Sequence, residues 1–175
     1  YAQLIYATDM SDPENGQFYQ SMQEAITEIS SKLIFFTLEI NRIEDDELEQ
    51  KLEAPELAHF APWIRDVRIF RPHQLSDELE KMLLEKSVTG RSAWIRLFDE
   101  TMADLRFKID DQELTIAETL DRLSHKESAK RKEAAMSLGA ELSNNIKLYS
   151  LITNSLAKDK EVEDKWRRYA KPVSS

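Results

Sequence analysis

Three histidines are the side chains of this 175-residue sequence best suited to bind a catalytic metal. They are His59, His73 and His125, and the sequence has no cysteine. A zinc hydrolase needs two imidazoles at positions i and i+4 of one helix, with a glutamate between them to activate water. No His-Glu-x-x-His segment is present, so we expect no catalytic residue, cofactor site or metal site in this chain. We interpret His59 and His73 as structural or surface residues and His125 as an exposed residue at a helix start.

Acidic side chains are concentrated between residues 44 and 56. They are Glu44, Asp45, Asp46, Glu47, Glu49, Glu53 and Glu56. A calcium-binding loop places carboxylates at alternate positions and has a glycine at its turn, and this segment contains no glycine. The run therefore favours the solvated face of a short helix.

Charge and composition exclude several further functions. Lys and Arg total 24 against 33 Asp and Glu, a net charge of -9, so the chain should repel phosphate backbones and bind no nucleic acid. The three glycines are too scattered for a phosphate-binding loop. No apolar run is long enough to span a membrane, and the absence of cysteine fits a cytoplasmic protein.

A long amphipathic helix is expected over roughly residues 13–43. Its apolar side chains keep an alternating three- and four-residue spacing: Tyr19, Met22, Ile26, Ile29, Leu33, Phe36, Ile40 and Ile43. Asp12 and Pro13 are a typical helix start. We interpret the stripe as the core-facing side of a helix in a bundle, and the alternative is a coiled-coil dimer seam.

Shorter helices should follow. One covers the acidic run and ends at Pro55, and the next extends from about Pro55 to Phe70 with Pro62 kinking or dividing it. The side chains expected inward on this second helix are Leu57, Phe60, Ile64, Val67 and Phe70. A helix capped by Ser76 should extend through residue 86, and another should follow a turn at residues 89–90 and end near residue 105.

The hydrophobic period then changes. Phe107 and Ile109 alternate with charged residues, and Leu114 and Ile116 lie beyond the polar turn 110–113, which predicts a β-hairpin. Capping boxes at residues 115–118 and 124–127 should open a short helix and then a long helix reaching residue 156, with Gly139 at a close helix contact. The fold class predicted is all-α, a multi-helix bundle with long antiparallel helices and one small β-hairpin near 106–116.

Three segments together resemble a known family. They are Leu33–Asn41, Arg71–Leu83 with the sequence RPHQLSDELEKML, and Thr89–Phe98 with the sequence TGRSAWIRLF, the last followed by the strand at Leu105–Phe107 and its return at Leu114–Thr115. In this order they resemble the N-terminal region of the oligoendopeptidase F family, zinc metallopeptidases related to thimet oligopeptidase. The later stretches 155–160 and 166–169 are similar to that family's lead-in to its catalytic half.

The resemblance implies that this chain has a non-catalytic role. Family members are much longer, and their His-Glu-x-x-His motif and downstream glutamate ligand would lie beyond Ser175, so no zinc ligand is carried over to this chain. Residues 1–157 would form an N-terminal helical lobe that walls the substrate channel, and residues 158–175 a charged connector toward the catalytic domain. The parent enzyme would use zinc to hydrolyse internal peptide bonds of oligopeptides in the cytoplasm, and the fragment alone would be inactive.

Two other functions are compatible with the residues. The chain could be a stand-alone helical interaction module that binds partner helices through its stripes at 19–43 and 135–156, and an oligomer is possible. It could also be a regulatory binder that uses its basic cluster, Lys126, Lys130, Arg131 and Lys132, although such clusters are more often solvated.

Overall fold

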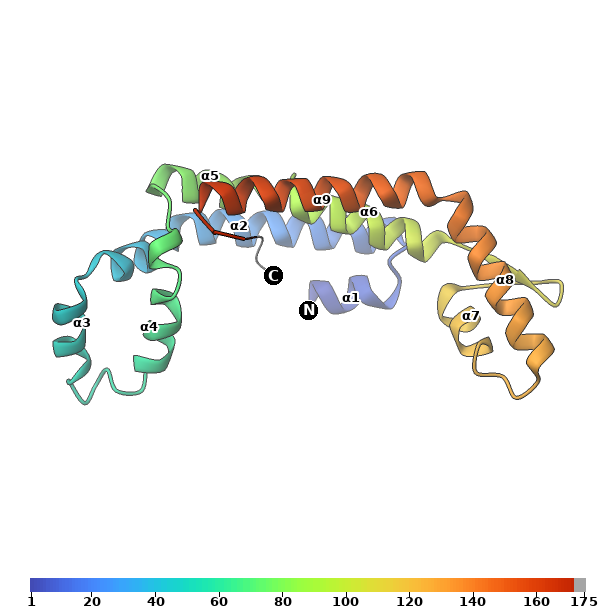
Figure 1. The fold of residues 1–175 in the computed structure, drawn as a ribbon, viewed down its shortest axis with the longest axis horizontal. Helices are drawn as coiled ribbons and strands as arrows, with labels where there is room; N and C mark the ends of the chain where they lie inside the picture. The colour runs from blue at the N-terminus through green and yellow to red at the C-terminus, as the bar shows by residue number, and fades with distance from the viewer. Residues whose placement is uncertain (172–175) are drawn as a thin grey trace. The chain divides into compact units, whose positions relative to one another are not determined.

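The computed structural model describes residues 1–171, which are mostly helical (Figure 1). The elements are α1 (Ala2–Thr8), α2 (Pro13–Arg42), α3 (Asp45–Leu52), α4 (Ala61–Arg68), a 3-10 turn η1 (Arg71–His73), α5 (Asp77–Lys86), α6 (Arg91–Asp104), β1 (Phe107–Ile109), β2 (Gln112–Leu114), α7 (Ile116–Arg122), α8 (Ser128–Asn144) and α9 (Ile146–Trp166). An all-α fold with one small hairpin is therefore confirmed.

The chain divides into two compact units. Unit 1 comprises residues 1–23 and 89–158, and unit 2 comprises residues 24–88 and those from 159 onward.

In unit 1 the hairpin is present with a shorter turn than predicted. Asp110 and Asp111 alone form the turn, both at positive φ, and Phe107 pairs with Leu114. Positive φ at both central residues is the conformation that matches the twist of a two-residue hairpin, and aspartate tolerates it. Gln112 and residue 113 belong to β2 rather than to the turn.

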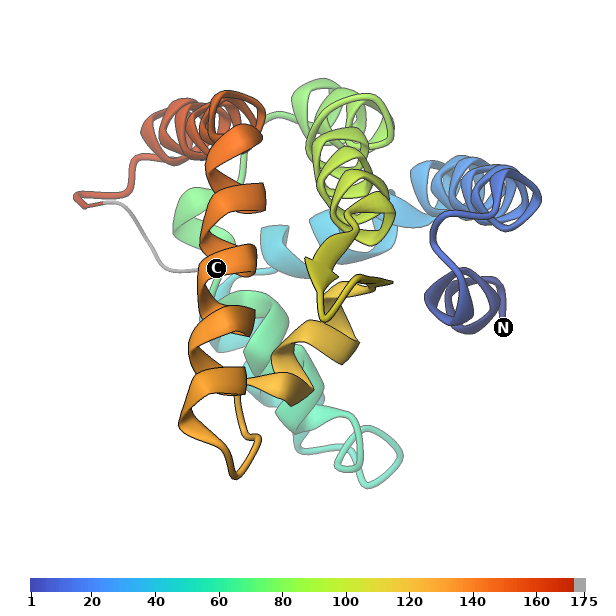
Figure 2. The ribbon, with the colours of Figure 1, turned by 90° about the vertical axis from the view of Figure 1, so that its right-hand side faces the viewer.

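The hairpin lies against α7 and α8 in unit 1 (Figure 2). Ile109 and Leu114 pack with Ala134 of α8, and Phe107 is completely buried. A lone hairpin is marginally stable in water, so this helical cover accounts for its presence. Ile116, which was expected in the return strand, is instead the first residue of α7.

The two predicted capping boxes have different outcomes. Thr115 and Glu118 make both reciprocal hydrogen bonds at the start of α7, as expected. Ser124 opens no helix, because residues 123–127 form a turn and α8 begins at Ser128. The predicted long helix is also interrupted at Asn145, and a side chain at Gly139 would meet no neighbour within 4 Å, so the close contact expected there is absent.

The first helix of unit 1, α1, was not predicted from the sequence. Tyr6 of α1 is buried and stacks on Tyr19 of α2, with ring centroids 4.7 Å apart. Burial, with the nearby carboxylates Glu100 and Asp99, raises the pKa of Tyr6 to about 12. Asp12 caps α2 as predicted, since its Oδ1 accepts a hydrogen bond from the backbone N–H of residue 14 at 2.9 Å.

In unit 2 the end of α2 packs with α3 and α4, which lie side by side (Figure 1). The buried cluster comprises Ile40, Leu48, Leu52, Ala61 and Ile64, with Ile43, Leu57 and Val67 packed against it. Residues 53–60 form turns, and Pro62 lies in the first turn of α4, so it starts that helix and does not kink it. Phe60 and Phe70 were expected inward and are both exposed.

The end of α9 has a defined stop in unit 2. Arg168 adopts a left-handed φ of 61°, and the N–H of Tyr169 donates to the carbonyl of Asp164 at 3.0 Å. The N–H of Arg168 bonds the carbonyl of Lys165 at 3.2 Å, which completes a Schellman motif. Since α9 runs without a break through residues 157 and 158, the division into a lobe and a connector there stays a prediction.

Candidate functional site

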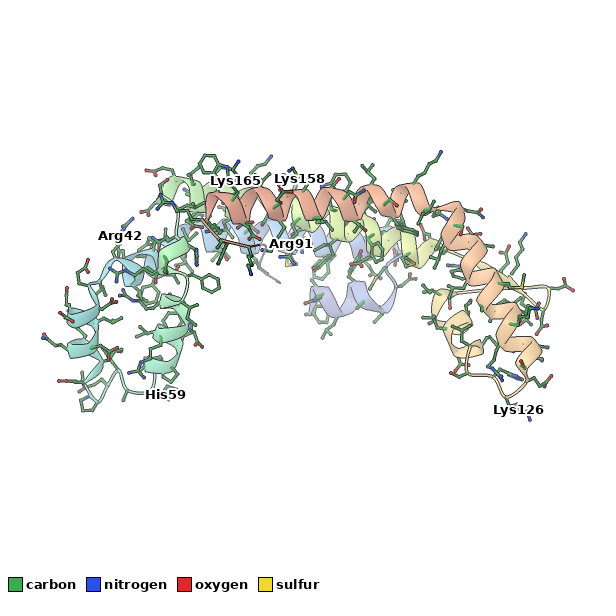
Figure 3. All side chains as sticks on the ribbon, in the orientation of Figure 1. Arg42, His59, Arg91, Lys126, Lys158 and Lys165 are labelled. Carbon is green, nitrogen blue, oxygen red and sulfur yellow. The ribbon has the colours of Figure 1, made fainter. Side chains whose placement is uncertain are left out.

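The three histidines lie in separate parts of the chain. His59 is exposed in the connection between α3 and α4, where Figure 3 labels it, and it contacts the edge of Phe60. His125 is half-buried in the loop before α8, not exposed at a helix start, and its Nδ1 accepts a hydrogen bond from the Glu127 N–H at 3.1 Å. Within residues 1–171, no group of three or more His, Asp or Glu side chains is placed to hold a metal ion.

His73 has a structural environment in unit 2. Its ring stacks on Tyr169 with centroids 3.8 Å apart and planes inclined by 24°. Its Nδ1 lies 2.8 Å from the carbonyl oxygen of Arg167, so Nδ1 carries the proton and donates. The ring therefore joins η1 to the residues that follow α9.

Arg167 lies at the centre of a group of interacting side chains that we call the Arg167 clasp. Its members are His73, Glu80, Glu163, Arg167 and Tyr169. Its guanidinium donates to both carboxylate oxygens of Glu80, at 2.7 and 2.9 Å, and its Nε donates to Glu163 at 2.7 Å. The Arg167 and Glu80 side chains are only 19% and 12% exposed. A planar guanidinium matches a carboxylate in this two-bond arrangement, which makes the pair stronger than a surface ion pair.

The clasp also shifts the ionisation of its members. Burial raises the pKa of the Glu80 carboxyl, but hydrogen bonds from Arg167 and from the Leu75 N–H, together with the Arg167 charge, outweigh it and leave the pKa below its ordinary value. The hydrogen bond to Glu80 raises the pKa of Arg167. Both groups are therefore charged at neutral pH.

The acidic run has a structural contact as well as a solvated face. Asp45 accepts hydrogen bonds from Arg68 and Arg71, and the Arg68 bond holds the pKa of the Asp45 carboxyl below its ordinary value. Arg68 donates to Asp45 through Nη2, and its Nη1 donates to the carbonyls of Ile40 and Ile43 at 2.8 and 2.6 Å. These are carbonyls left without partners where α2 ends, so Arg68 caps that helix end.

The basic cluster is divided between local contacts and solvent. Arg131 donates to the carbonyls of His125 and Lys126, at 2.8 and 3.0 Å, and so fixes the loop before α8. Lys130 lies 3.9 Å from the Asp110 carboxylate at the hairpin turn. Figure 3 shows Lys126 in that loop. This arrangement holds the loop and hairpin, and it does not converge on one point in the way an anion site requires.

A more informative surface is the apolar stripe of α2, whose orientation differs from the prediction. We define the α2 apolar face as Ile26, Ile29, Leu33 and Phe36, all in unit 2. These side chains are 62%, 57%, 59% and 53% exposed. The side of the helix that is buried carries Ser31 and Leu38, and the Ser31 hydroxyl donates to Glu85 of α5 at 2.5 Å. In unit 2, α2 thus turns its most apolar face to solvent.

The α2 apolar face continues onto α4. Phe36 stacks on Trp63 with ring centroids 6.1 Å apart and planes inclined by 16°, and Trp63 is itself 45% exposed. Large contiguous apolar surfaces are uncommon on monomeric soluble proteins and mark interaction sites. The periodicity of the sequence identified these residues as one face, but it could not indicate that the face points outward.

A shallow hollow in unit 1 lies between β2, α7 and the following loop, lined by Leu114, Glu118, Arg122 and His125 among others. Along residues 1–171 no helix is both long enough and apolar enough to cross a membrane.

Part of this helical fold is similar to a known protein family. Residues 39–107 match the family model described as Oligopeptidase F, so the resemblance drawn from the sequence is confirmed over that segment. The match extends from the last turn of α2 through α3, α4, α5 and α6 to the start of β1.

Solved structures extend the likeness to nearly the whole chain. The oligoendopeptidase-F of Enterococcus faecium is similar over 98% of this chain, with a TM-score of 0.87 and 21% identity. A Chlamydophila abortus protein classed only provisionally as a peptidase is similar over 97%, with a TM-score of 0.61 and 16% identity. This chain spans 35% and 30% of the lengths of those two chains. No curated protein sequence matches it.

Proposed function

We propose that this chain is the N-terminal helical lobe of an oligoendopeptidase F-type metallopeptidase, which walls the substrate channel and performs no chemistry itself. The observation that carries the proposal is the agreement with the Enterococcus faecium oligoendopeptidase-F over 98% of this chain. The Oligopeptidase F match over residues 39–107 supports it independently. The parent enzyme would hydrolyse internal peptide bonds of oligopeptides, and its cytoplasmic location is part of the proposal.

Zinc belongs to the proposed parent rather than to these residues. The histidines and carboxylates among residues 1–171 form no group of three that could hold a metal ion. A catalytic zinc needs three protein ligands and an open position for water. The ligands would therefore come from the catalytic domain, which is the proposed partner of this lobe together with oligopeptide substrates.

The activity claim is tested with the 175-residue chain and a set of internally quenched oligopeptides. With zinc supplied, we expect no cleavage above buffer, because the sequence has no His-Glu-x-x-His segment and residues 1–171 form no group of three metal ligands to activate water. Turnover that disappears on adding a chelator would contradict the proposal. The E. faecium oligoendopeptidase-F, assayed in the same buffer, is the positive control for the substrates.

The claim about the parent is tested on its coding sequence. We expect the reading frame to continue past the codon for Ser175 into a His-Glu-x-x-His segment, since nearly two thirds of the similar structure lies outside the match. A stop codon directly after the codon for Ser175 would overturn the claim.

The exposed α2 apolar face also favours a second candidate function, that of a stand-alone helical interaction module. Such a module would form a stable oligomer of one size with no further chain present. Sedimentation velocity separates the two functions, because a detached lobe should show no oligomer of fixed stoichiometry.

A further inference from the structure

The α2 apolar face has the spacing of a helix-packing seam. Its residues follow the 4-3-4-3 alternation that places side chains at the a and d positions of a heptad, with Ile26 and Leu33 at a and Ile29 and Phe36 at d. The f positions of the same heptads, on the opposite side, are Ser31 and Leu38, and both are buried. Unit 2 therefore uses the side of α2 opposite its seam for its own packing.

The same seam is already occupied where α2 ends. Ile40 and Ile43, the next a and d residues, pack against the buried cluster that α3 and α4 contribute. One turn earlier, Phe36 is covered on one side by Trp63. The uncovered part from Ile26 to Phe36 thus continues an existing helix-helix interface.

The dimensions of the uncovered part fit one further helix. The eleven helical residues from Ile26 to Phe36 extend about 15 Å, or about three turns, which a partner helix of about ten to twelve residues would cover. The g positions beside the seam hold Lys32 and Glu39, one cation and one anion, and the e positions hold Ser30 and Thr37, which are uncharged. A charged margin beside an apolar centre is typical of helix-in-groove recognition.

We propose that an amphipathic α-helix from the remaining part of the parent peptidase packs along Ile26, Ile29, Leu33 and Phe36. This inference rests on the proposed function, because the matched fold continues for nearly two thirds of its length beyond the region this chain covers. The partner helix would present its own apolar residues at a and d spacing and would extend the packing that α3 and α4 begin at Ile40.

The test uses the absence of cysteine from residues 1–175. The variants Ile29→Cys and Leu33→Cys report on the seam. The matched control is Glu28→Cys, at a c position of the same helix away from the seam, where the glutamate side chain is 72% exposed. Each is made in the 175-residue chain and in the full-length parent enzyme, labelled with a maleimide, and quantified on the α2 peptide by mass spectrometry. Peptidase activity of each full-length variant shows that it has folded.

In the 175-residue chain at low concentration, Ile29→Cys and Leu33→Cys should label about as fast as Glu28→Cys. In the parent enzyme we expect labelling of the two seam variants to slow at least about tenfold while the control stays fast. Equal labelling of all three variants in an active parent enzyme would overturn the inference and leave the proposed function intact. A parent without peptidase activity would instead remove the proposed function.

Two other occupants are separate outcomes. Protection that appears in the 175-residue chain alone, increases with its concentration and accompanies a dimer mass would show that a second copy is the occupant. Protection of the parent enzyme only after an oligopeptide is added would assign the face to substrate. Either result would overturn the helix assignment.

Discussion

At the scale of single residues, Arg167 joins parts of unit 2 that are far apart in the sequence. Its guanidinium reaches Glu80, 87 residues earlier, through two hydrogen bonds, and also donates to the carbonyl of His73 at 3.3 Å. The Arg167–Glu80 pair is largely shielded from water, so if one member is removed, water solvates the remaining charge poorly. Its stability contribution should therefore exceed that of any fully exposed ion pair in the described chain.

The substitution Arg167→Ala should lower the free energy of unfolding by about 2 kcal/mol, because it leaves the Glu80 carboxylate shielded from water without its cation. The measurement is urea unfolding of the 175-residue chain, followed by circular dichroism. Arg65→Ala is the matched control, since Arg65 and Glu49 form a pair that is more than half exposed, and it should cost less than about 0.5 kcal/mol. Equal costs for the two variants would show that the clasp adds no stability.

The ionisation of Glu80 predicts how stability depends on pH. Its pKa is lower in the folded chain than in the unfolded one, so the folded state favours the charged carboxylate. The resulting stability is fully present above the unfolded pKa of about 4.5 and is lost as the pH falls through the folded value. The unfolding free energy of the unmodified chain should therefore fall between about pH 5 and pH 3 more steeply than that of Glu80→Gln. Parallel pH profiles would contradict this, and Glu49→Gln, at an exposed site, should leave the steep profile unchanged.

At the scale of elements, the sequence identified most helices and the hairpin but not how they meet. The alternation of Phe107 and Ile109 correctly indicated β1, because period two is a local property of the backbone. The turn length was wrong because the left-handed conformation of Asp110 and Asp111 requires no glycine. The interruption at Asn145 carries no proline or glycine signal, so periodicity continued across it.

The orientation of α2 could not be predicted from the sequence for a different reason. Periodicity shows which residues share a face, but the direction of that face depends on what the rest of the fold covers. The contact between His73 and Arg167 was also invisible, since nothing local in either segment encodes a partner so distant in sequence. The candidate sites of this chain are accordingly properties of its tertiary structure.

The exposure of the α2 apolar face gives a prediction opposite to the usual result for apolar-to-polar substitution. Ile29→Gln should change the free energy of unfolding by less than about 0.5 kcal/mol, because Ile29 is already more than half exposed to water and glutamine has a good helix propensity. Ile64→Ala, at a buried position of the cluster with Ile40, should cost about 3 kcal/mol. Urea midpoints of the two variants check both values. A cost above about 2 kcal/mol for Ile29→Gln would show that the face is buried in solution.

At the scale of the whole molecule, two opposing forces act between copies of the chain. The net charge of -9 repels, and exposed apolar side chains attract. Charge repulsion is screened over about 8 Å at physiological ionic strength and over about 3 Å at 1 M salt, whereas apolar attraction is not weakened by salt. Added salt should therefore shift the balance toward association.

We expect the 175-residue chain to associate weakly and without a fixed stoichiometry, more strongly in 0.5 M than in 0.05 M sodium chloride. Static light scattering across a concentration series gives the second virial coefficient, which should become more negative with salt. The double variant Ile29→Gln and Leu33→Gln should reverse most of this change, because it removes the apolar contact and preserves the net charge. Lys32→Gln, which lies beside the face and leaves its apolar residues in place, should retain the salt effect. If the double variant associates as strongly as the unmodified chain, the attraction arises from another surface, such as the exposed side chains Ile69 and Phe70 after α4.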